Sequence, residues 1–428
     1  MKDVYHRARS LLSVQHWRGR LLVWAAAGGV GCAAVGFALL ADAAQALFRH
    51  VVAASALWPW LLTPLGLFTI AWLTGRYFKG AEGSGIPQTI FALRTESEPQ
   101  SLALLRLRVL AGRVLLSAGA LACGASIGRE GPTVHVGAAI THAVARFIPH
   151  GDTRALRRML ILAGGAAGVA AAFNTPLAGV VFAIEELSRS FEERANGTTL
   201  TAVVLAGITA IALVGNYTYF GQPHLGTLAH LLSPTVFAVA LAGGLAGGLF
   251  SRLTLACVRG LPGILGQLQR TRPAVFALSC GLALAAIGWA TGGRTYGSGY
   301  VEARMILEHN VQLPWIYAPA RAAATMLSYL SGIPAGLLAP SLSIGAGLGQ
   351  ALGDLFAENT VAYSAVLGMC GYLAGVTQAP LTTLVIVMEM TSGQQIVLPL
   401  MLATTIATGT AKLISPPLYR TLAERYVA

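Results

Sequence analysis

The sequence of 428 residues predicts an all-α integral membrane protein. Hydrophobic residues make up 55% of it and charged residues only 11%, and its mean hydropathy is +0.65. A soluble domain carries about 25% charged residues, and a membrane-spanning helix needs about 20 mostly apolar residues in a row. Apolar runs recur along almost the whole chain. The clearest are Leu21 to Phe48, Leu57 to Thr74, Leu102 to Cys123, Val203 to Val214, Val236 to Cys257 and Val275 to Thr291.

Short motifs also recur in the same order in the two halves of the chain. The matching segments are Gly83–Ile86 and Gly297–Tyr300, Gly131–Ala138 and Ala339–Ala346, and Thr175–Leu177 and Ala379–Leu381. Glu185 and Glu389 each follow the proline of the last pair by nine residues, which suggests a structural role for this pair. Apolar segments interrupted by Gly and Pro at matching positions are typical of transporters built from repeats. We therefore expect broken and tilted helices in two inverted-topology repeats.

The repeat and the charges near the two ends set the expected domains. These are a cytoplasmic N-terminal segment 1–17, a first transmembrane repeat 18–220, a linker 221–231, a second transmembrane repeat 232–415 and a C-terminal helix 416–428. We expect no soluble regulatory domain. Cations cluster at both ends, which places both termini in the cytoplasm. They are Lys2, Arg7, Arg9, Arg18 and Arg20 at the start and Lys412, Arg420 and Arg425 near the end.

The remaining composition argues against several other classes of protein. The first 20 residues are polar and basic and lack the apolar core of a signal peptide. The formal charge of +12 comes from cations in short loops, which favours contact with lipid over binding of nucleic acid. The cysteines lack the spacing of a metal site, so we expect neither a metal nor an organic cofactor. They are Cys32, Cys123, Cys257, Cys280 and Cys370.

Three segments read as the starts of helices inside the membrane: Gly83–Pro87, Gly128–Pro132 and Gly332–Pro340. In the first, Ser84 can serve as N-cap and Pro87 fits a first helical turn. A helix N-terminus presents free N–H groups and about half a positive charge. Several such ends meeting near the midplane would hold an anion without a full cation in lipid. The alternative is that each cluster is a plain turn between spans.

These segments resemble, in order, the three signature motifs of the CLC chloride channels and antiporters. The resemblance rests on Gly83–Pro87, Gly128–Pro132 and Gly336–Pro340, and Phe173–Gly179 and Pro417–Tyr419 extend it over nearly the whole chain. It implies two inverted halves per subunit, a homodimer and one independent anion pathway in each subunit. The expected absence of a soluble tail suggests a multi-pass protein of a prokaryotic plasma (inner) membrane.

The resemblance also implies the anion-binding residues. Ser84 would contribute its hydroxyl, Tyr419 its phenol, and Leu337 and Leu338 their backbone N–H groups. The family usually has Ile-Phe where Leu337-Leu338 stands here, and because these contacts come from the backbone we expect little change in binding. The alternatives are a plain N-cap for Ser84 and an interfacial anchor for Tyr419. The residues that shape the helix N-termini are Gly83, Gly85, Pro87, Gly128, Arg129, Gly131 and Pro132.

Two glutamates are expected to carry protons. A carboxylate at a helix N-terminus is stabilised by the same dipole that binds an anion. Glu130 can therefore occupy an anion site when ionised and leave it when protonated, which makes it gate and external proton carrier. The alternative is a salt bridge to Arg129. By resemblance, Glu186 matches the internal proton-transfer glutamate of the antiporters. Its alternative is a carboxylate at the membrane interface beside Arg189 and Arg194.

The predicted function is exchange of chloride for protons, with a passive chloride channel as the alternative. Arg113 either supports the anion path with its charge or is a structural charge. The expected partners are the lipid bilayer, a second copy of the chain, chloride and protons. A serine hydrolase is a different class, suggested by Gly124–Gly128 with His135 and His142 downstream. A nucleophile elbow needs a strand before its turn, so we expect no enzyme.

Overall fold

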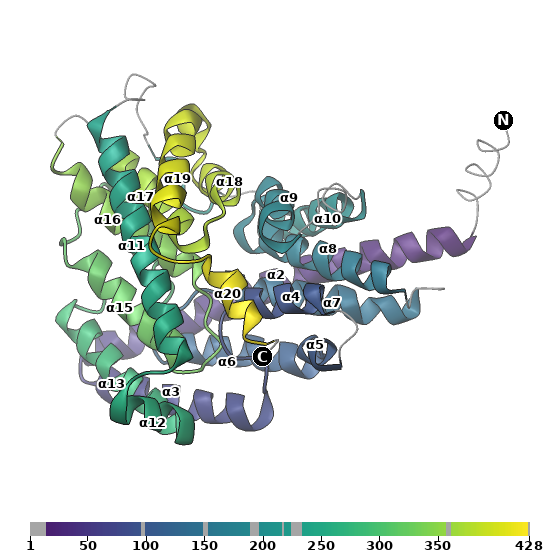
Figure 1. Ribbon diagram of the computed structural model, residues 1–428, viewed down its shortest axis with the longest axis horizontal. Coiled ribbons are helices and arrows are strands. Elements are labelled where there is room, and N and C mark those ends of the chain that lie inside the picture. The colour runs from purple at the N-terminus through teal and green to yellow at the C-terminus, as the bar shows by residue number, and fades with distance from the viewer. Residues whose placement is uncertain are drawn as a thin grey trace.

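The apolar runs form helices, as predicted. The computed structural model describes residues 14–95, 99–148, 153–188, 197–215, 218–223, 233–356 and 361–426. Within these ranges there are helices and two isolated bridges but no strand. By length and composition, five of the described helices can cross a membrane. The all-α prediction is therefore confirmed (Figure 1).

The helices follow the two halves of the chain. The first half contains α2 (Val14–Ala54), α3 (Trp58–Tyr77), α4 (Ile86–Arg94), α5 (Pro99–Leu104), α6 (Leu107–Ala122), α7 (Glu130–Val144), η1 (Ala145–Phe147), α8 (Arg154–Phe173), α9 (Pro176–Phe182), η2 (Ala183–Leu187) and α10 (Gly197–Val214). The second contains α11 (Pro234–Arg259), α12 (Gly263–Thr271), α13 (Pro273–Ala290), α14 (Tyr300–His309), α15 (Tyr317–Leu330), α16 (Leu338–Gly353), α17 (Val361–Thr377), α18 (Pro380–Thr391), η4 (Gly393–Ile396), α19 (Val397–Lys412) and α20 (Leu418–Glu424).

The two halves pack their helices in the same way. In the first half α7 lies on α8, α8 contacts α2, α9 and α10, and α6 contacts α3 and α7. In the second half α16 lies on α17, α17 contacts α11, α18 and α19, and α15 contacts α13 and α16. Figure 1 shows the halves side by side, with α20 at the junction between them. The repeated motifs of the sequence thus have a counterpart in the helix packing.

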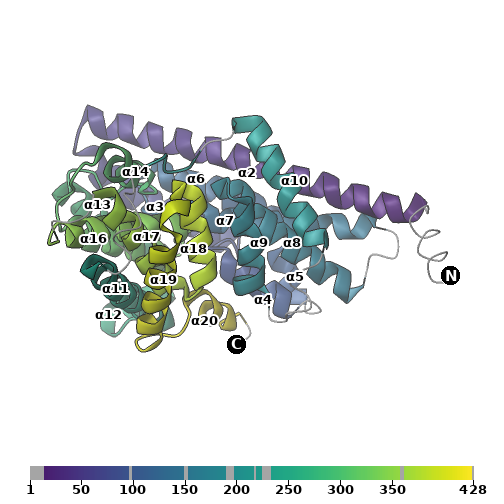
Figure 2. The same cartoon turned by 90° about the horizontal axis from the view of Figure 1, so that it is seen from above.

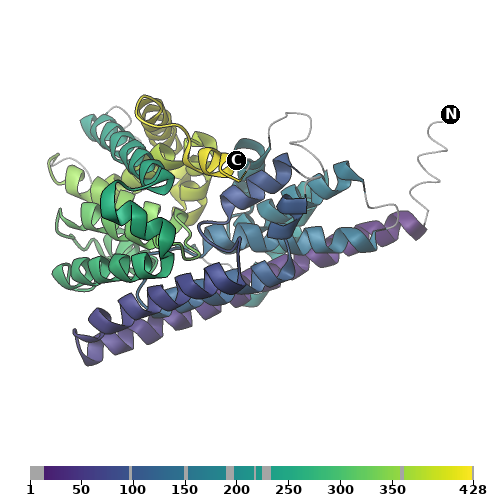
Figure 3. The same ribbon diagram turned by 60° about the horizontal axis from the view of Figure 1, so that its bottom comes forward.

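Helix α2 is far longer than a bilayer requires. It has 41 residues, whereas about 20 suffice to span the apolar core. Figures 2 and 3 show it running along one edge of the molecule. The N-terminal segment expected at 1–17 lies almost wholly outside the described residues, as does most of the linker expected at 221–231. Those boundaries remain predictions.

One expected run does not form a single helix. The stretch from Leu102 to Cys123 is divided between α5, which ends at Leu104, and α6, which begins at Leu107. Arg106 has an extended backbone (ψ 141°) between them. Arg106 is the N-cap of α6. The apolar run predicted a helix from Leu102, whereas α6 begins at Leu107.

Small residues let the helices of each half approach closely. A Cβ atom on Gly137 of α7 would overlap the carbonyl group of Gly164 in α8. A Cβ atom on Gly345 of α16 would likewise overlap the carbonyl group of Gly368 in α17. Gly137 and Gly345 occupy matching positions of the repeat. Close backbone contact of this kind replaces the hydrophobic effect as a source of helix association in lipid.

Substituting either helix-contact glycine should destabilise the fold. We expect Gly137→Ala and Gly345→Ala each to cost about 1–3 kcal/mol, because the added methyl group meets backbone that cannot move aside. Thermal unfolding of the purified protein in detergent measures this. Gly36→Ala in α2 is the matched control, since its Cβ would meet nothing within 4 Å. Equal melting temperatures for Gly345→Ala and Gly36→Ala would contradict the packing account.

Candidate anion-binding site

The three motif segments meet through backbone hydrogen bonds. The Gly83 N–H donates to the Ile333 carbonyl at 3.0 Å, and the Ala335 N–H donates to the Gly83 carbonyl at 3.0 Å. The Gly128 N–H donates to the Gly336 carbonyl at 2.8 Å. The third motif therefore pairs with both of the others, although it lies in the opposite half of the chain. This pairing brings together the N-terminal ends of α4, α7 and α16.

Glycines permit this approach. A Cβ on Gly131 would lie 2.5 Å from the Ser84 hydroxyl oxygen, and a Cβ on Gly336 would overlap the Gly128 carbonyl. Gly85 has a φ of 94°, which side-chain-bearing residues rarely adopt. The contacts of Gly131 and Gly336 each join two of the three motifs. The motif glycines thus act by letting main chains touch.

Ser84 is not the N-cap that its sequence context suggested. Helix α4 begins at Ile86 and its N-cap is Gly85, whose N–H donates to the side-chain oxygen of Gln88 at 3.0 Å. Pro87 stands in the first turn, as expected. The positive φ of Gly85 moves the helix start one residue along. The Ser84 hydroxyl is consequently not used for capping.

Two buried hydroxyls are left without a protein partner at this point. Ser84 is fully buried and Tyr419 is 1% exposed. The side chain of Ser84 lies beside that of Tyr419, yet neither hydroxyl oxygen has a hydrogen-bond partner within the described part of the chain. Buried polar atoms nearly always have a partner. Two such hydroxyls beside converging helix N-termini suit a bound anion.

Leu337 and Leu338 form the start of α16. Leu337 is the N-cap and Leu338 the first helical residue, and both are buried. The first N–H groups of a helix have no partner within that helix. The pair therefore supplies free backbone donors close to Gly336, which contacts Gly128.

Glu130 lies in the gap between α7 and α16. It is the first residue of α7, it is fully buried, and its carboxyl group lies next to the backbone of Gly128 and Ala339. The Tyr219 hydroxyl donates to its Oε1 atom at 3.4 Å. Arg129 is turned away and forms its ion pair with Asp42 at 2.8 Å.

Sequence reasoning missed Tyr219. It lies at the end of the first half, beside the stretch predicted to be the linker, and no motif marks it. Its ring also lies 5.9 Å from the guanidinium of Arg129. Contact across 89 residues is set by the fold.

Glu186 lies in the π-helix η2. It is only 5% exposed, and its Oε1 atom has no hydrogen-bond partner. The charged side chains that act on it are Arg420, Glu185 and Arg94. The expected neighbours Arg189 and Arg194 lie outside the described residues. A π-helical turn inside an apolar helix is often found at a functional position.

Glu185 and Glu389 cap helices in opposite halves. The Glu185 carboxylate accepts a hydrogen bond from the Thr382 N–H at 2.6 Å, at the start of α18. The Glu389 carboxylate accepts one from the Ala178 N–H at 2.7 Å, at the start of α9. Each half thus completes a helix of the other, which accounts for their matching positions in the repeat.

Arg113 is bound by backbone carbonyl groups. It is fully buried and donates to the carbonyls of Gly83 at 2.8 Å and Gly80 at 2.9 Å. These contacts fix the loop before α4. Arg321 does the same in the second half and donates to the Gly297 carbonyl at 2.6 Å. Arg321 was not among the predicted residues, although it follows Arg113 by the offset that separates Gly131 from Ala339 in the second pair of motifs.

The hydrolase-like motif has a different environment from a nucleophile elbow. The Ser126 hydroxyl is hydrogen-bonded to that of Thr325 at 2.9 Å, and its backbone N–H donates to Ser328. The segment Gly124–Gly128 follows a helix, α6. Among the described residues, no group of three or more His, Cys, Asp or Glu side chains is placed to hold a metal ion.

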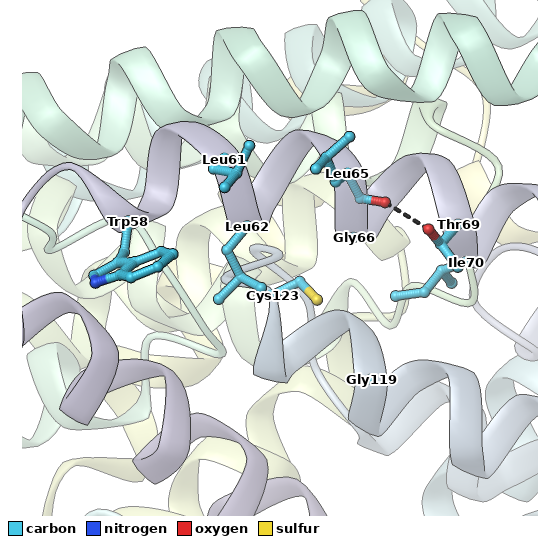
Figure 4. Close-up of a pocket in the computed structure, with 9 residues that line it drawn as sticks. All are labelled: Trp58, Leu61, Leu62, Leu65, Gly66, Thr69, Ile70, Gly119 and Cys123. Atoms are coloured by element: carbon cyan, nitrogen blue, oxygen red, sulfur yellow. Dashed lines mark hydrogen bonds between the residues drawn. The ribbon is translucent and has the colours of Figure 1, made fainter.

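An apolar pocket of about 400 Å³, lined by none of the proposed anion-binding residues, lies between α3 and the end of α6 (Figure 4). Trp58, Leu61 and Leu62 line it together with Cys123. The Cys123 sulfur packs against Gly66 so closely that a Cβ there would overlap it. The thiol therefore fills space between helices, and the pocket carries no charged side chain.

Comparison with known proteins gives consistent matches. Residues 66–412 match the family model described as voltage gated chloride channel. The H(+)/Cl(-) exchange transporter ClcA of Cronobacter sakazakii is 31% identical over 384 residues, which are 86% of this chain and 79% of that protein. The H(+)/Cl(-) exchange transporter ClcA of Citrobacter koseri is 32% identical over 418 residues, which are 90% of this chain and 82% of that protein.

Solved structures share the fold. A slow cyanobacterial Cl⁻/H⁺ antiporter superimposes with a TM-score of 0.78 at 24% identity, over 95% of this chain and 97% of that one. A CLC-type fluoride/proton antiporter superimposes with a TM-score of 0.80 at 22% identity, over 96% of this chain and 98% of that one. The expected architecture of two inverted repeats is thereby confirmed.

Removing either reciprocal cap should destabilise the protein by a similar amount. We expect Glu185→Ala and Glu389→Ala each to cost about 1 kcal/mol, since each leaves N–H groups of a helix start without an acceptor. The melting temperature of the purified variants reports the loss. Glu308→Ala is a suitable control, because Glu308 caps no described helix start and pairs within its own helix with the exposed Arg304, and pairs of this kind contribute little. A Glu389 variant that melts like the control would refute the capping role.

Proposed function

The chain belongs to the voltage gated chloride channel family, the CLC family, and on that basis we propose that it exchanges chloride for protons across the membrane. Relatives that are 31% and 32% identical carry the name of H(+)/Cl(-) exchange transporters. The observation that carries the proposal is the pair of unpartnered buried hydroxyls of Ser84 and Tyr419, with Glu130 in the gap between two nearby helix ends.

The central anion is bound by dipoles. Ser84 and Tyr419 donate their hydroxyl hydrogens to it, and Leu337 and Leu338 donate their backbone N–H groups. The partial positive charge at the start of α16 adds to this attraction. A binding site without a fixed cation holds an anion weakly enough for it to leave. Arg113 contributes by fixing the Gly83 carbonyl, and so the loop that presents Ser84.

Glu130 couples the anion path to protons. When ionised, its carboxylate occupies the gap between α7 and α16 and competes with an anion for the same helix ends. Tyr219 donates to this carboxylate and stabilises it there. When protonated, the side chain loses that attraction and leaves the gap to an anion. Each opening of the anion path therefore involves a proton on Glu130.

Glu186 supplies protons from the other side. A carboxyl group that is 5% exposed within a membrane protein is costly to keep and is usually functional. Glu186 lies in η2 and Glu130 in α7. Protons that enter through Glu186 then join the anion path at Glu130. This residue favours exchange over a passive channel.

The protein is a multi-pass membrane protein, and we also propose its orientation in the membrane and its oligomeric state. Both termini face the cytoplasm, because the flanking cations remain inside, and the cell is prokaryotic, as for the two bacterial relatives. Two copies form a homodimer, each with its own pathway. The exchange moves an anion and transfers protons to and from carboxyl groups, with no redox or group-transfer step, so the residues named above suffice without a metal or an organic cofactor.

A direct test is chloride-driven proton movement. Proteoliposomes that contain the purified protein are given a chloride gradient while the membrane potential is clamped, and proton uptake is recorded. We expect protons to move uphill, driven by chloride alone. Chloride flux without proton movement would indicate a passive channel instead. A complete lack of chloride flux would contradict chloride as the substrate.

Neutral replacements should separate the roles of the two glutamates. We expect Glu130→Gln to abolish proton movement while anions still pass, because an amide neither competes as an anion nor carries a proton. Glu186→Gln should also uncouple the protein and leave the anion path open. Parallel chloride and proton fluxes measure both effects, with Glu308→Gln, at a partly exposed carboxylate outside the proposed site, as the control. Full proton coupling in either variant would remove that residue from the mechanism.

A further inference from the structure

The short helix α20 is joined to two elements that carry proposed site residues. Arg420 directly follows Tyr419, and its guanidinium donates a hydrogen bond to the backbone carbonyl of Glu185 in η2. On the other side, Glu424 of α20 forms an ion pair with Arg94 of α4 at 3.7 Å. Tyr419 thus belongs to a helix that is joined both to η2, which contains Glu186, and to α4, which follows Ser84.

The Arg420 guanidinium lies close to Glu186, because it is bonded to the carbonyl of the preceding residue, and Arg420, Glu185 and Arg94 are the charges that act on Glu186. The other two charges that act on Glu186 are engaged elsewhere, since Arg94 pairs with Glu424 and the Glu185 carboxylate caps α18. Arg420 forms no ion pair with any described residue, Glu186 included. No ion pair with a described residue therefore offsets the positive charge of Arg420 close to the Glu186 carboxyl group.

A buried carboxyl group needs such support. Glu186 has an oxygen atom without a hydrogen-bond partner, and an ionised carboxylate in this condition is costly. An opposite charge nearby favours the ionised form, and the carbonyl of Glu185 fixes where that charge stands. Because the tie is to the main chain next to Glu186, the guanidinium keeps its position when Glu186 gains or loses its proton.

Arg420 also lines a polar cavity of about 480 Å³. The cavity is lined by Thr377, Gln378, Lys412, Ser415, Pro416, Pro417 and Arg420. Lys412 brings a second cation to the same cavity, whereas Arg420 is the one bonded to the main chain next to Glu186. Lys412 is therefore a matched control for the charge of Arg420.

We propose that Arg420 is a positioning residue for proton transfer by Glu186: its bond to the Glu185 carbonyl places a positive charge that lets Glu186 ionise while buried. The proposal rests on the exchange function above. It makes α20 common to both substrates, because Tyr419 serves the anion and the next residue serves the proton. The anion path itself does not require the Arg420 charge.

The test is a parallel measurement of chloride and proton flux in proteoliposomes for the wild type, Arg420→Gln, Arg420→Lys and Lys412→Gln. We expect Arg420→Gln to lower the protons moved per chloride about five- to tenfold, since the carboxyl group then stays protonated, while chloride flux continues. Arg420→Lys should restore most of the coupling. Lys412→Gln should leave the ratio unchanged. A normal ratio in Arg420→Gln, or an equal loss in Lys412→Gln, would overturn the proposal.

A second measurement does not depend on coupled transport. Glu186→Cys is prepared in a background without the native cysteines, with Arg420 or with Gln at position 420. The rates of modification by an anionic and a cationic methanethiosulfonate reagent are then compared. We expect Arg420→Gln to lower the anionic-to-cationic rate ratio at position 186 several-fold. An unchanged ratio would refute the charge effect, even if the wild type proved to be uncoupled and the exchange function were wrong.

Discussion

The backbone pairing of the third motif with the first two is the constraint on which the site depends. A membrane gives little hydration to a bare anion, and a fixed cation would hold the anion too long. Helix ends avoid both problems only when several point at one place. The bonds of Gly83 and Gly128 to residues 333–336 bring these ends together. The glycines, the buried arginines and the unpartnered hydroxyls all depend on that contact.

The inverted repeat duplicates the residues that support the site but not the residues proposed to bind the anion and carry the proton. Arg113 and Arg321 fix equivalent loops through carbonyl groups. The hydroxyl of Ser298, the counterpart of Ser84, donates to the side chain of Gln45 at 3.0 Å and is thereby satisfied. The position matching Glu130 is Leu338. The two halves therefore share a scaffold, whereas one half keeps the free hydroxyl and the carboxylate.

Much of this architecture could be predicted from the sequence because it depends on local patterns. Apolar runs gave the spans, and the three motifs predicted helix ends at the places where they are found. The failures come from contacts that no local pattern encodes. The cap at Gly85 follows from its positive φ, and the pairing of Tyr219 with Glu130 depends on distant segments. The proposed role of Arg420 depends on its hydrogen bond to Glu185 in η2, a contact between distant segments. Arg321 is different, since the repeat offset alone could have revealed it.

The reciprocal caps have a consequence for how the protein is made. The N–H groups at the start of α9 depend on Glu389, which lies 211 residues beyond Ala178. During synthesis the first half enters the membrane long before that carboxylate leaves the ribosome. The N–H groups at the start of α9 must remain hydrated or covered by the insertion machinery until the second half is inserted. Final assembly of the first half is thus a late event in biogenesis, and a truncated chain would expose this uncapped end to quality control.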